Sequence, residues 1–110
     1  MLKSPEKFHS ANGKRQILVA DDELINREIL GAILSSSYEV IFACDGGETL
    51  EKVRENKDTL SLVLLDILMP VVSGLEVLKE MKSDAQLSKI PVIVMTAERD
   101  AEVESLRIGA

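Results

Sequence analysis

The sequence predicts an α/β domain built on a doubly wound parallel sheet with helices on both faces. Short apolar runs alternate along the chain with segments that have the period of about 3.6 residues typical of an amphipathic helix. Strands that alternate with helices form βαβ units, and their right-handed crossovers place the strands parallel. The 110 residues suffice for one core, which must be aliphatic because only 3% of the residues are aromatic.

The first half of the chain contains two expected strands and two expected helices. Residues 16–20 (QILVA) form a short apolar strand, and residues 38–43 (YEVIFA) form a second, rich in β-branched and aromatic residues. Asp45 stands three residues before a glutamate, a capping pattern that opens a helix ending near Asn56. Residues 24–36 have the period of an amphipathic helix, whose apolar positions are Ile25, Ile29, Leu30, Ile33 and Leu34.

The second half repeats this alternation. Residues 60–66 are apolar on both faces, as expected of a strand covered on both sides. A capping box at Ser73 opens the next helix, and residues 90–95 (IPVIVM) form the fourth strand. Residues 100–108 are expected to form a last helix, with Val103 and Leu106 inward and Gly109 just after its end.

Composition limits the possible partners and location. The net charge of −6 argues against binding of nucleic acid or of an anionic membrane surface by this domain. No apolar run reaches the about 18 residues of a membrane span, and the first residues lack the apolar core of a secretory signal. The single cysteine, Cys44, fits a reducing cytoplasm and is expected to be a small buried hydrophobe. Polar residues 1–15 are expected to be a flexible leader before a domain of residues 16–110.

Acidic side chains follow two of the expected strands where each strand ends. Asp21 and Asp22 follow the first strand, and Asp66 ends the third. In a doubly wound sheet the carboxyl ends of the strands share one rim, and ligands bind there where the strand order reverses. Crowded carboxylates repel one another unless a cation joins them, and hard oxygen ligands suit Mg²⁺ or Mn²⁺.

This arrangement makes Asp66 a plausible nucleophile that accepts a phosphoryl group as an aspartyl phosphate. Thr96, a hydroxyl at the end of the fourth strand, could donate a hydrogen bond to the phosphoryl oxygens. Each residue alone has a structural explanation: Asp66 can end a strand, the acids at 21–23 can begin a helix, and Thr96 can cap one. Their coincidence on one rim favours a site.

With these residues placed, residues 16–110 resemble the receiver domain of two-component response regulators, which has a flavodoxin-like fold. The resemblance depends on an acidic pair after the first strand, an Asp-x-x-Met-Pro-x-x-x-Gly run from Asp66, and Thr96-Ala97 after the fourth strand. The matching segments are ILVADDELINREIL (17–30), LVLLDILMPVVSGLEVL (62–78), IPVIVMTAERD (90–100) and ESLRIGA (104–110).

The resemblance implies a role for each matching position. Asp66 would be the phosphoacceptor, and Asp21 and Asp22 would bind Mg²⁺ or Mn²⁺ together with Asp66 and the backbone carbonyl of Leu68. Thr96 would be the switch hydroxyl, and the backbone N–H of its neighbour would bind the phosphoryl group. That neighbour is Ala97.

The resemblance also implies a signalling domain rather than an enzyme, catalysing at most its own phosphoryl transfer and dephosphorylation. A histidine kinase or a phosphotransfer protein would supply the phosphoryl group to Asp66. The family pattern continues with a fifth strand, ending in a lysine, and a fifth helix, neither of which has a counterpart before Ala110. We therefore expect a C-terminally incomplete domain, whose fourth strand is an edge that pairs with a second copy of the chain.

Three alternatives remain open at this point. A receiver that binds partners without being phosphorylated would also fit the absent lysine. A phosphatase or phosphotransferase with an Asp nucleophile usually carries a second acid two residues later, where this chain has Leu68. A nucleotide-binding domain would need a glycine-rich loop where the chain has Ala20-Asp21-Asp22.

Overall fold

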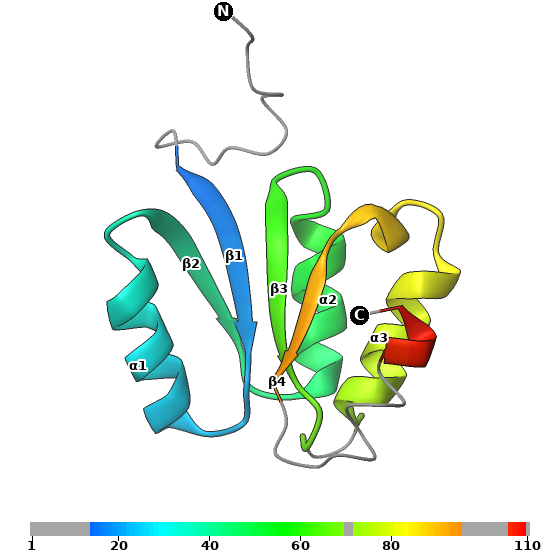
Figure 1. Cartoon of the computed structure of the whole chain (residues 1–110), viewed down its shortest axis with the longest axis horizontal. Coiled ribbons are helices and arrows are strands. Elements are labelled where there is room, and N and C mark those ends of the chain that lie inside the picture. Colours follow the sequence, from blue (N-terminus) through cyan, green and yellow to red (C-terminus); the bar gives the residue numbers. More distant parts are fainter. Residues whose placement is uncertain (1–13, 70–71, 96–105, 110) are drawn as a thin grey trace, which may run out of the picture.

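The computed structural model describes residues 14–69, 72–95 and 106–109 (Figure 1). Strands and helices alternate along the chain, as the sequence predicts. In chain order the elements are β1 (Arg15–Ala20), α1 (Leu24–Leu34), β2 (Tyr38–Ala43), α2 (Gly46–Glu55), β3 (Leu60–Asp66), α3 (Gly74–Ser83), the 3₁₀ turn η2 (Leu87–Lys89) and β4 (Val92–Met95).

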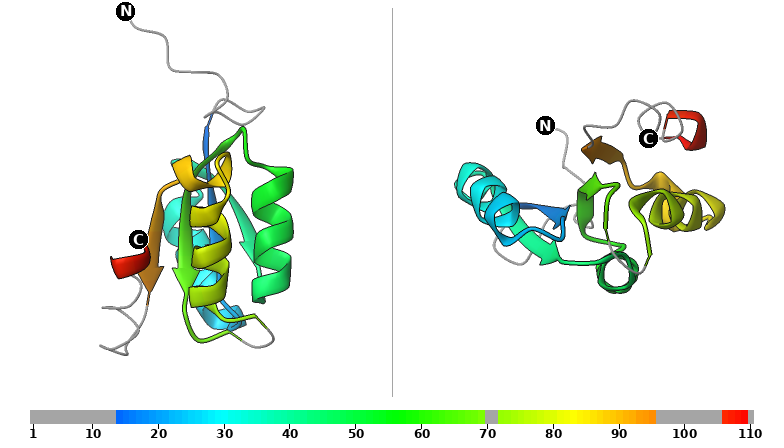
Figure 2. Two further views of the ribbon diagram at one scale, coloured as in Figure 1. Left: turned by 90° about the vertical axis from the view of Figure 1, so that its right-hand side faces the viewer. Right: turned by 90° about the horizontal axis from the view of Figure 1, so that it is seen from below.

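The described strands form one parallel sheet in the order β2-β1-β3-β4. The chain runs from β1 outward to β2 and then returns to place β3 on the other side of β1, so the strand order reverses between β1 and β3. Helix α1 covers one face of the sheet, and α2 and α3 cover the opposite face (Figure 2). The predicted doubly wound α/β fold is confirmed.

Two predicted helix starts are confirmed by their capping contacts. The Asp45 side chain accepts a hydrogen bond from the Glu48 N–H at 2.7 Å, and a Glu48 carboxylate oxygen accepts one from the Cys44 N–H at 2.7 Å. At the start of α3, Ser73 Oγ accepts a hydrogen bond from the Glu76 N–H at 3.3 Å. Since a capped N-terminus satisfies donors that have no partner within the helix, these residues determine where α2 and α3 begin.

The core is aliphatic, as the composition predicts. It lies mainly between the sheet and the helix pair α2 and α3, and β3 contributes to it along its whole length. Its larger buried side chains are each at most 2% exposed and include Leu18, Val53, Leu60, Val63, Leu65, Val77, Leu78, Met81 and Leu87.

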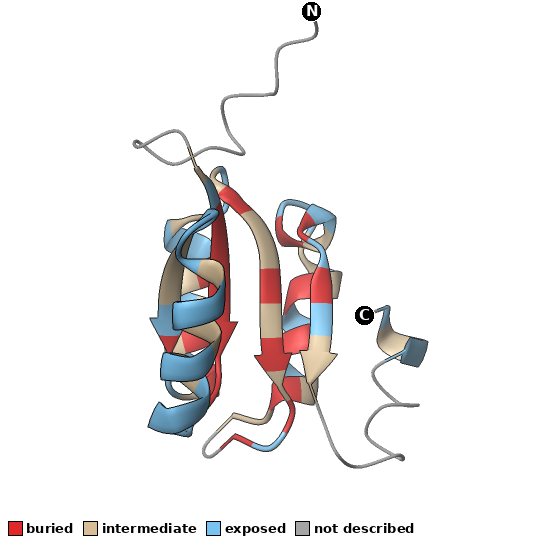
Figure 3. Ribbon diagram, turned by 60° about the vertical axis from the view of Figure 1, so that its left-hand side comes forward, coloured by how far each residue is buried: buried red, intermediate tan, exposed pale blue. Residues whose placement is uncertain are grey.

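Helix α1 turns part of its apolar surface to the solvent. Leu30 and Leu34 are half-buried toward the sheet, whereas the isoleucine row is largely exposed: 67% for Ile25, 53% for Ile29 and 65% for Ile33 (Figure 3). The predicted helical period is right, but this row stays exposed, while α1 packs against β1 and β2. Ile93 of β4 is also exposed, at 53%.

Two element bounds differ by two residues from the sequence-based ones, and β1 begins one residue earlier than predicted, at Arg15. α1 ends at Leu34, and the chain then turns, with Ser37 N–H donating to the Leu34 carbonyl at 3.1 Å. β4 begins at Val92 rather than at residue 90, because η2 precedes it and Pro91 has no N–H for a sheet ladder.

Two side-chain expectations were wrong. Cys44 is exposed, because the chain turns away from the sheet after β2 to enter α2. Leu106 is 62% exposed, and Ile108 instead packs against the core. Gly109 follows the helical residues 106–108 with a φ of 120°, a conformation that favours glycine, as expected after a helix end.

Candidate functional site

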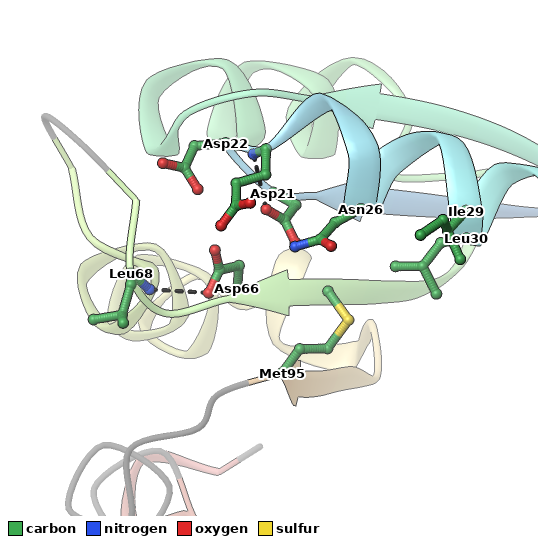
Figure 4. Close-up of a pocket in the computed structure, with 9 residues that line it drawn as sticks. Asp21, Asp22, Asn26, Ile29, Leu30, Asp66, Leu68 and Met95 are labelled. Carbon is green, nitrogen blue, oxygen red and sulfur yellow. Dashed lines mark hydrogen bonds between the residues drawn. The ribbon is translucent and has the colours of Figure 1, made fainter.

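Three carboxylates meet at the sheet edge where the strand order reverses. Ala20 of β1 pairs with Leu65 of β3, so the residues that follow them leave the sheet side by side. One carboxylate oxygen from each of Asp21, Asp22 and Asp66 lies within 4.8 Å of the other two. Figure 4 shows the three side chains turned toward one another from the ends of β1 and β3. The structure thus brings together the three acids selected from the sequence.

Asp21 is the most fixed of the three. Its side chain is only 4% exposed, and its Oδ1 accepts a hydrogen bond from the Glu23 N–H at 2.9 Å. Its Oδ2 accepts one from Asn26 Nδ2 at 3.2 Å. Its backbone is held as well, since Arg27 Nη1 donates to the Asp21 carbonyl at 2.7 Å. Asp22, by contrast, is exposed at the mouth of the site.

The loop after β3 sets the orientation of Asp66. The Leu68 N–H donates to Asp66 Oδ1 at 3.1 Å, and the Gly74 N–H donates to the Ile67 carbonyl at 2.9 Å. A Cβ at Gly74 would lie 2.3 Å from the Asp66 carbonyl oxygen, so α3 can begin this close to β3 only because residue 74 is glycine. The start of α3 therefore supports the strand end that carries Asp66.

Partial burial, together with the acids around it, changes the protonation of Asp66. Partial burial, the negative charges of Asp21 and Asp22, and a hydrogen bond with Asp22 raise the pKa of Asp66 from 3.8 to about 6, against the opposing Leu68 N–H. A cation bound beside these carboxylates would lower the pKa of Asp66 again and favour its ionised form. The cluster therefore has an electrostatic demand for positive charge.

The donor set fits a small divalent ion. Three carboxylate oxygens at this separation are hard ligands, and Mg²⁺ typically takes one or two carboxylates and keeps several waters. The acids open into a cavity of about 490 Å³, which leaves room for further ligands. The cavity is lined by Asp21, Asp22, Glu23, Asn26, Ile29, Leu30, Asp66, Leu68 and Met95.

The structure describes only some of the other residues predicted for the site. Thr96 and Ala97 lie outside the described residues, although Met95, the last residue of β4, pairs with Asp66 and lines the cavity. Leu68 is 55% exposed beside Asp66. The sequence analysis did not select Asn26. Its place in the first turn of α1, shortly after the acidic pair, was the only available signal.

Comparison with known proteins identifies the family. The model of the response regulator receiver domain matches residues 17–110. The chain belongs to the response regulator receiver family. Receiver domains are signalling domains of two-component systems. The match confirms the family and the fold class predicted from the sequence.

Individual relatives agree with this assignment. Response regulator RR06 of Streptococcus pneumoniae is 47% identical over 90 residues, which cover 81% of this chain and 39% of RR06. The structure of the phosphorylated cyanobacterial phytochrome response regulator RcpA matches with a TM-score of 0.80 and 28% identity, over 88% of this chain and 76% of RcpA. The Mn²⁺-bound form of response regulator Rcp1 matches with a TM-score of 0.76 and 27% identity, over 86% of this chain and 76% of Rcp1.

The chain covers only part of the length of several of its relatives. It spans less than two thirds of the length of the first curated relatives that it matches, such as 39% of RR06. No helix in the described part of the chain is long and apolar enough to cross a membrane.

Proposed function

We propose that Asp66 of this receiver domain accepts a phosphoryl group from a histidine kinase or a phosphotransfer protein, and that the modification switches the conformation of the domain. The observation that carries the proposal is the position of Asp66 within 4.8 Å of the acidic pair, at the edge of an open cavity. The phosphorylated relative RcpA supports it. The domain would act as a signalling module in the cytoplasm, catalysing at most its own phosphoryl transfer and dephosphorylation.

The metal would be held by Asp21, Asp22, Asp66 and the backbone carbonyl of Leu68. When bound, Mg²⁺ or Mn²⁺ would neutralise the negative charge of the phosphoryl group in the transition state. The raised pKa of Asp66 and the Mn²⁺-bound form of the relative Rcp1 support this assignment.

In the transfer itself, a carboxylate oxygen of Asp66 would form a bond to phosphorus as the bond from phosphorus to the donor's histidine nitrogen breaks. The electron pair of the broken bond leaves with the histidine. The Leu68 N–H holds Oδ1 at 3.1 Å, which leaves Oδ2 for the attack. Ionised Asp66 is required, because a protonated carboxyl is a poor nucleophile.

Thr96 and Ala97 would bind the phosphoryl group by hydrogen bonds. We assign to the Thr96 hydroxyl a hydrogen bond to a phosphoryl oxygen and to the Ala97 N–H a second one. The pairing of Met95, the last residue of β4, with Asp66 supports this, because it brings the end of β4 beside Asp66 at the rim of the sheet. A charge of about −1.5 to −2 added at Asp66 would then bias the loop after β4 between two arrangements.

Phosphorylation with a small donor tests the proposal. The purified chain is incubated with acetyl phosphate with and without Mg²⁺, and the aspartyl phosphate is measured by intact mass and peptide mapping. We expect one phosphoryl group on Asp66, dependent on Mg²⁺, that is absent in Asp66→Asn and retained in Asp58→Asn, a change of an exposed aspartate outside the site. Absence of label in the wild type, or equal label in Asp66→Asn, would contradict the proposal and favour a phosphorylation-independent interaction module.

A further inference from the structure

The carboxylate of Asp21 is held by two donors of different kinds. The Glu23 N–H, 2.9 Å from Oδ1, is a backbone group that almost any residue at that position would supply. The Asn26 amide, 3.2 Å from Oδ2, is a side-chain group that depends on the identity of the residue. Asn26 is therefore a side chain outside the three acids that donates directly to one of their carboxylates.

The fold places Asn26 for this contact. It is the third residue of α1, and helical side chains lean toward the helix N-terminus, which here faces the end of β1. The next residue, Arg27, reaches the Asp21 backbone carbonyl at 2.7 Å rather than its carboxylate. Figure 4 shows the Asn26 amide nitrogen turned to Asp21 at the wall of the cavity. The first turn of α1 therefore holds Asp21 at both its main chain and its side chain.

The chemical type of residue 26 matters. A neutral amide donates a hydrogen bond to Asp21 and adds no charge beside it, so it does not compete with a cation. A lysine or arginine bonded to the same oxygen would compete with the metal, and an aspartate would add a fourth negative charge. Partners that orient ligating carboxylates typically change metal affinity by about 10–100-fold when they are replaced.

We infer that Asn26 is a positioning residue for the acidic site, which orients the Asp21 carboxylate toward the cation. The inference rests on the proposed function, since it requires that Asp21, Asp22 and Asp66 bind a divalent ion. Asn26 acts through Asp21 and has no step of its own in phosphoryl transfer.

Titration calorimetry with Mg²⁺, combined with thermal unfolding in EDTA, tests the inference. Asn26→Leu removes the donor and should weaken Mg²⁺ binding about tenfold or more. Asn26→Gln keeps an amide donor and should recover most of the affinity. Ala32→Leu, at an exposed position of the same helix, is the matched control and should bind as the wild type does. The unfolding temperature of metal-free Asn26→Leu should fall only modestly, because the better helix propensity of leucine offsets part of the lost hydrogen bond to Asp21.

The outcomes separate the inference from the function on which it rests. If Asn26→Leu binds Mg²⁺ as tightly as the wild type while Asp22→Ala binds weakly, the metal site stands and the inference is overturned. A fall in metal-free stability that accounts for the lost affinity, without recovery in Asn26→Gln, would also overturn it. If Asp22→Ala and Asp66→Asn bind like the wild type, the proposed metal site itself is wrong.

Discussion

At the scale of single residues, the protonation of Asp66 links the chemistry of the site to stability. The pKa of Asp66 is raised from 3.8 to about 6 by partial burial and by the charges of Asp21 and Asp22. The folded metal-free domain therefore binds a proton at Asp66 more tightly than the unfolded chain does. This contribution to stability is complete below about pH 4 and is lost as the pH rises through about 6.

Urea unfolding in EDTA between pH 4 and pH 7 measures this effect. We expect the unfolding free energy of the wild type to fall more steeply with pH than that of Asp66→Asn, in which the side chain cannot ionise. Added Mg²⁺ should restore the wild type at pH 7. Parallel pH profiles for the two proteins would show that the ionisation of Asp66 is not coupled to folding.

At the scale of elements, the close approach of α3 to β3 supports the site. A Cβ at Gly74 would meet the Asp66 carbonyl oxygen at 2.3 Å, and this contact is to backbone, which cannot rotate away. The contrasting position is Gly47 in α2, where an added Cβ would have only an ordinary contact of 3.4 Å with the Asp45 side chain.

Gly74→Ala should therefore destabilise the domain by about 1–3 kcal/mol in urea unfolding, the usual cost of overpacking. It should also weaken Mg²⁺ binding, because the strand end that carries Asp66 must shift. Gly47→Ala is the matched control and should be neutral or stabilising by up to about 1 kcal/mol, since alanine is the better helix former. Equal stability of the two variants would mean that the loop after β3 relaxes without cost.

At the scale of the whole molecule, the apolar surface beside β4 predicts association of the chain with a second copy. Among the described strands β4 pairs only with β3, and Ile93 on it is 53% exposed. A strand edge with no partner among the described strands and an exposed apolar side chain invites another chain, and the isoleucine row of α1 is a further exposed apolar surface.

Light scattering over a concentration series tests this prediction. The mass should rise toward that of a dimer or larger assembly, and Ile93→Lys should return it to that of a monomer, because a lysine on a strand edge opposes pairing. Ser83→Lys, at an exposed position of α3, is the control and should associate like the wild type. A monomer at every concentration, or association unchanged by Ile93→Lys, would contradict it.

Much of the candidate site could be read from the order of elements. Once strands and helices alternate, the carboxyl ends of β1 and β3 must share a rim, so the meeting of Asp21, Asp22 and Asp66 followed without knowledge of any distance. The support of those acids could not be read in this way. The contact of Asn26 with Asp21 depends on how the first turn of α1 meets the end of β1.

By itself the sequence determined the succession of elements, the two capped helix starts and the aliphatic nature of the core, because each depends on local spacing or composition. Only the tertiary structure decided which surface of each element is covered. The isoleucines of α1 have a perfect helical period yet are exposed, and Cys44 is apolar enough for a core yet faces solvent. Periodicity shows that a helix has an apolar side, whereas burial depends on which other elements the packing brings against it.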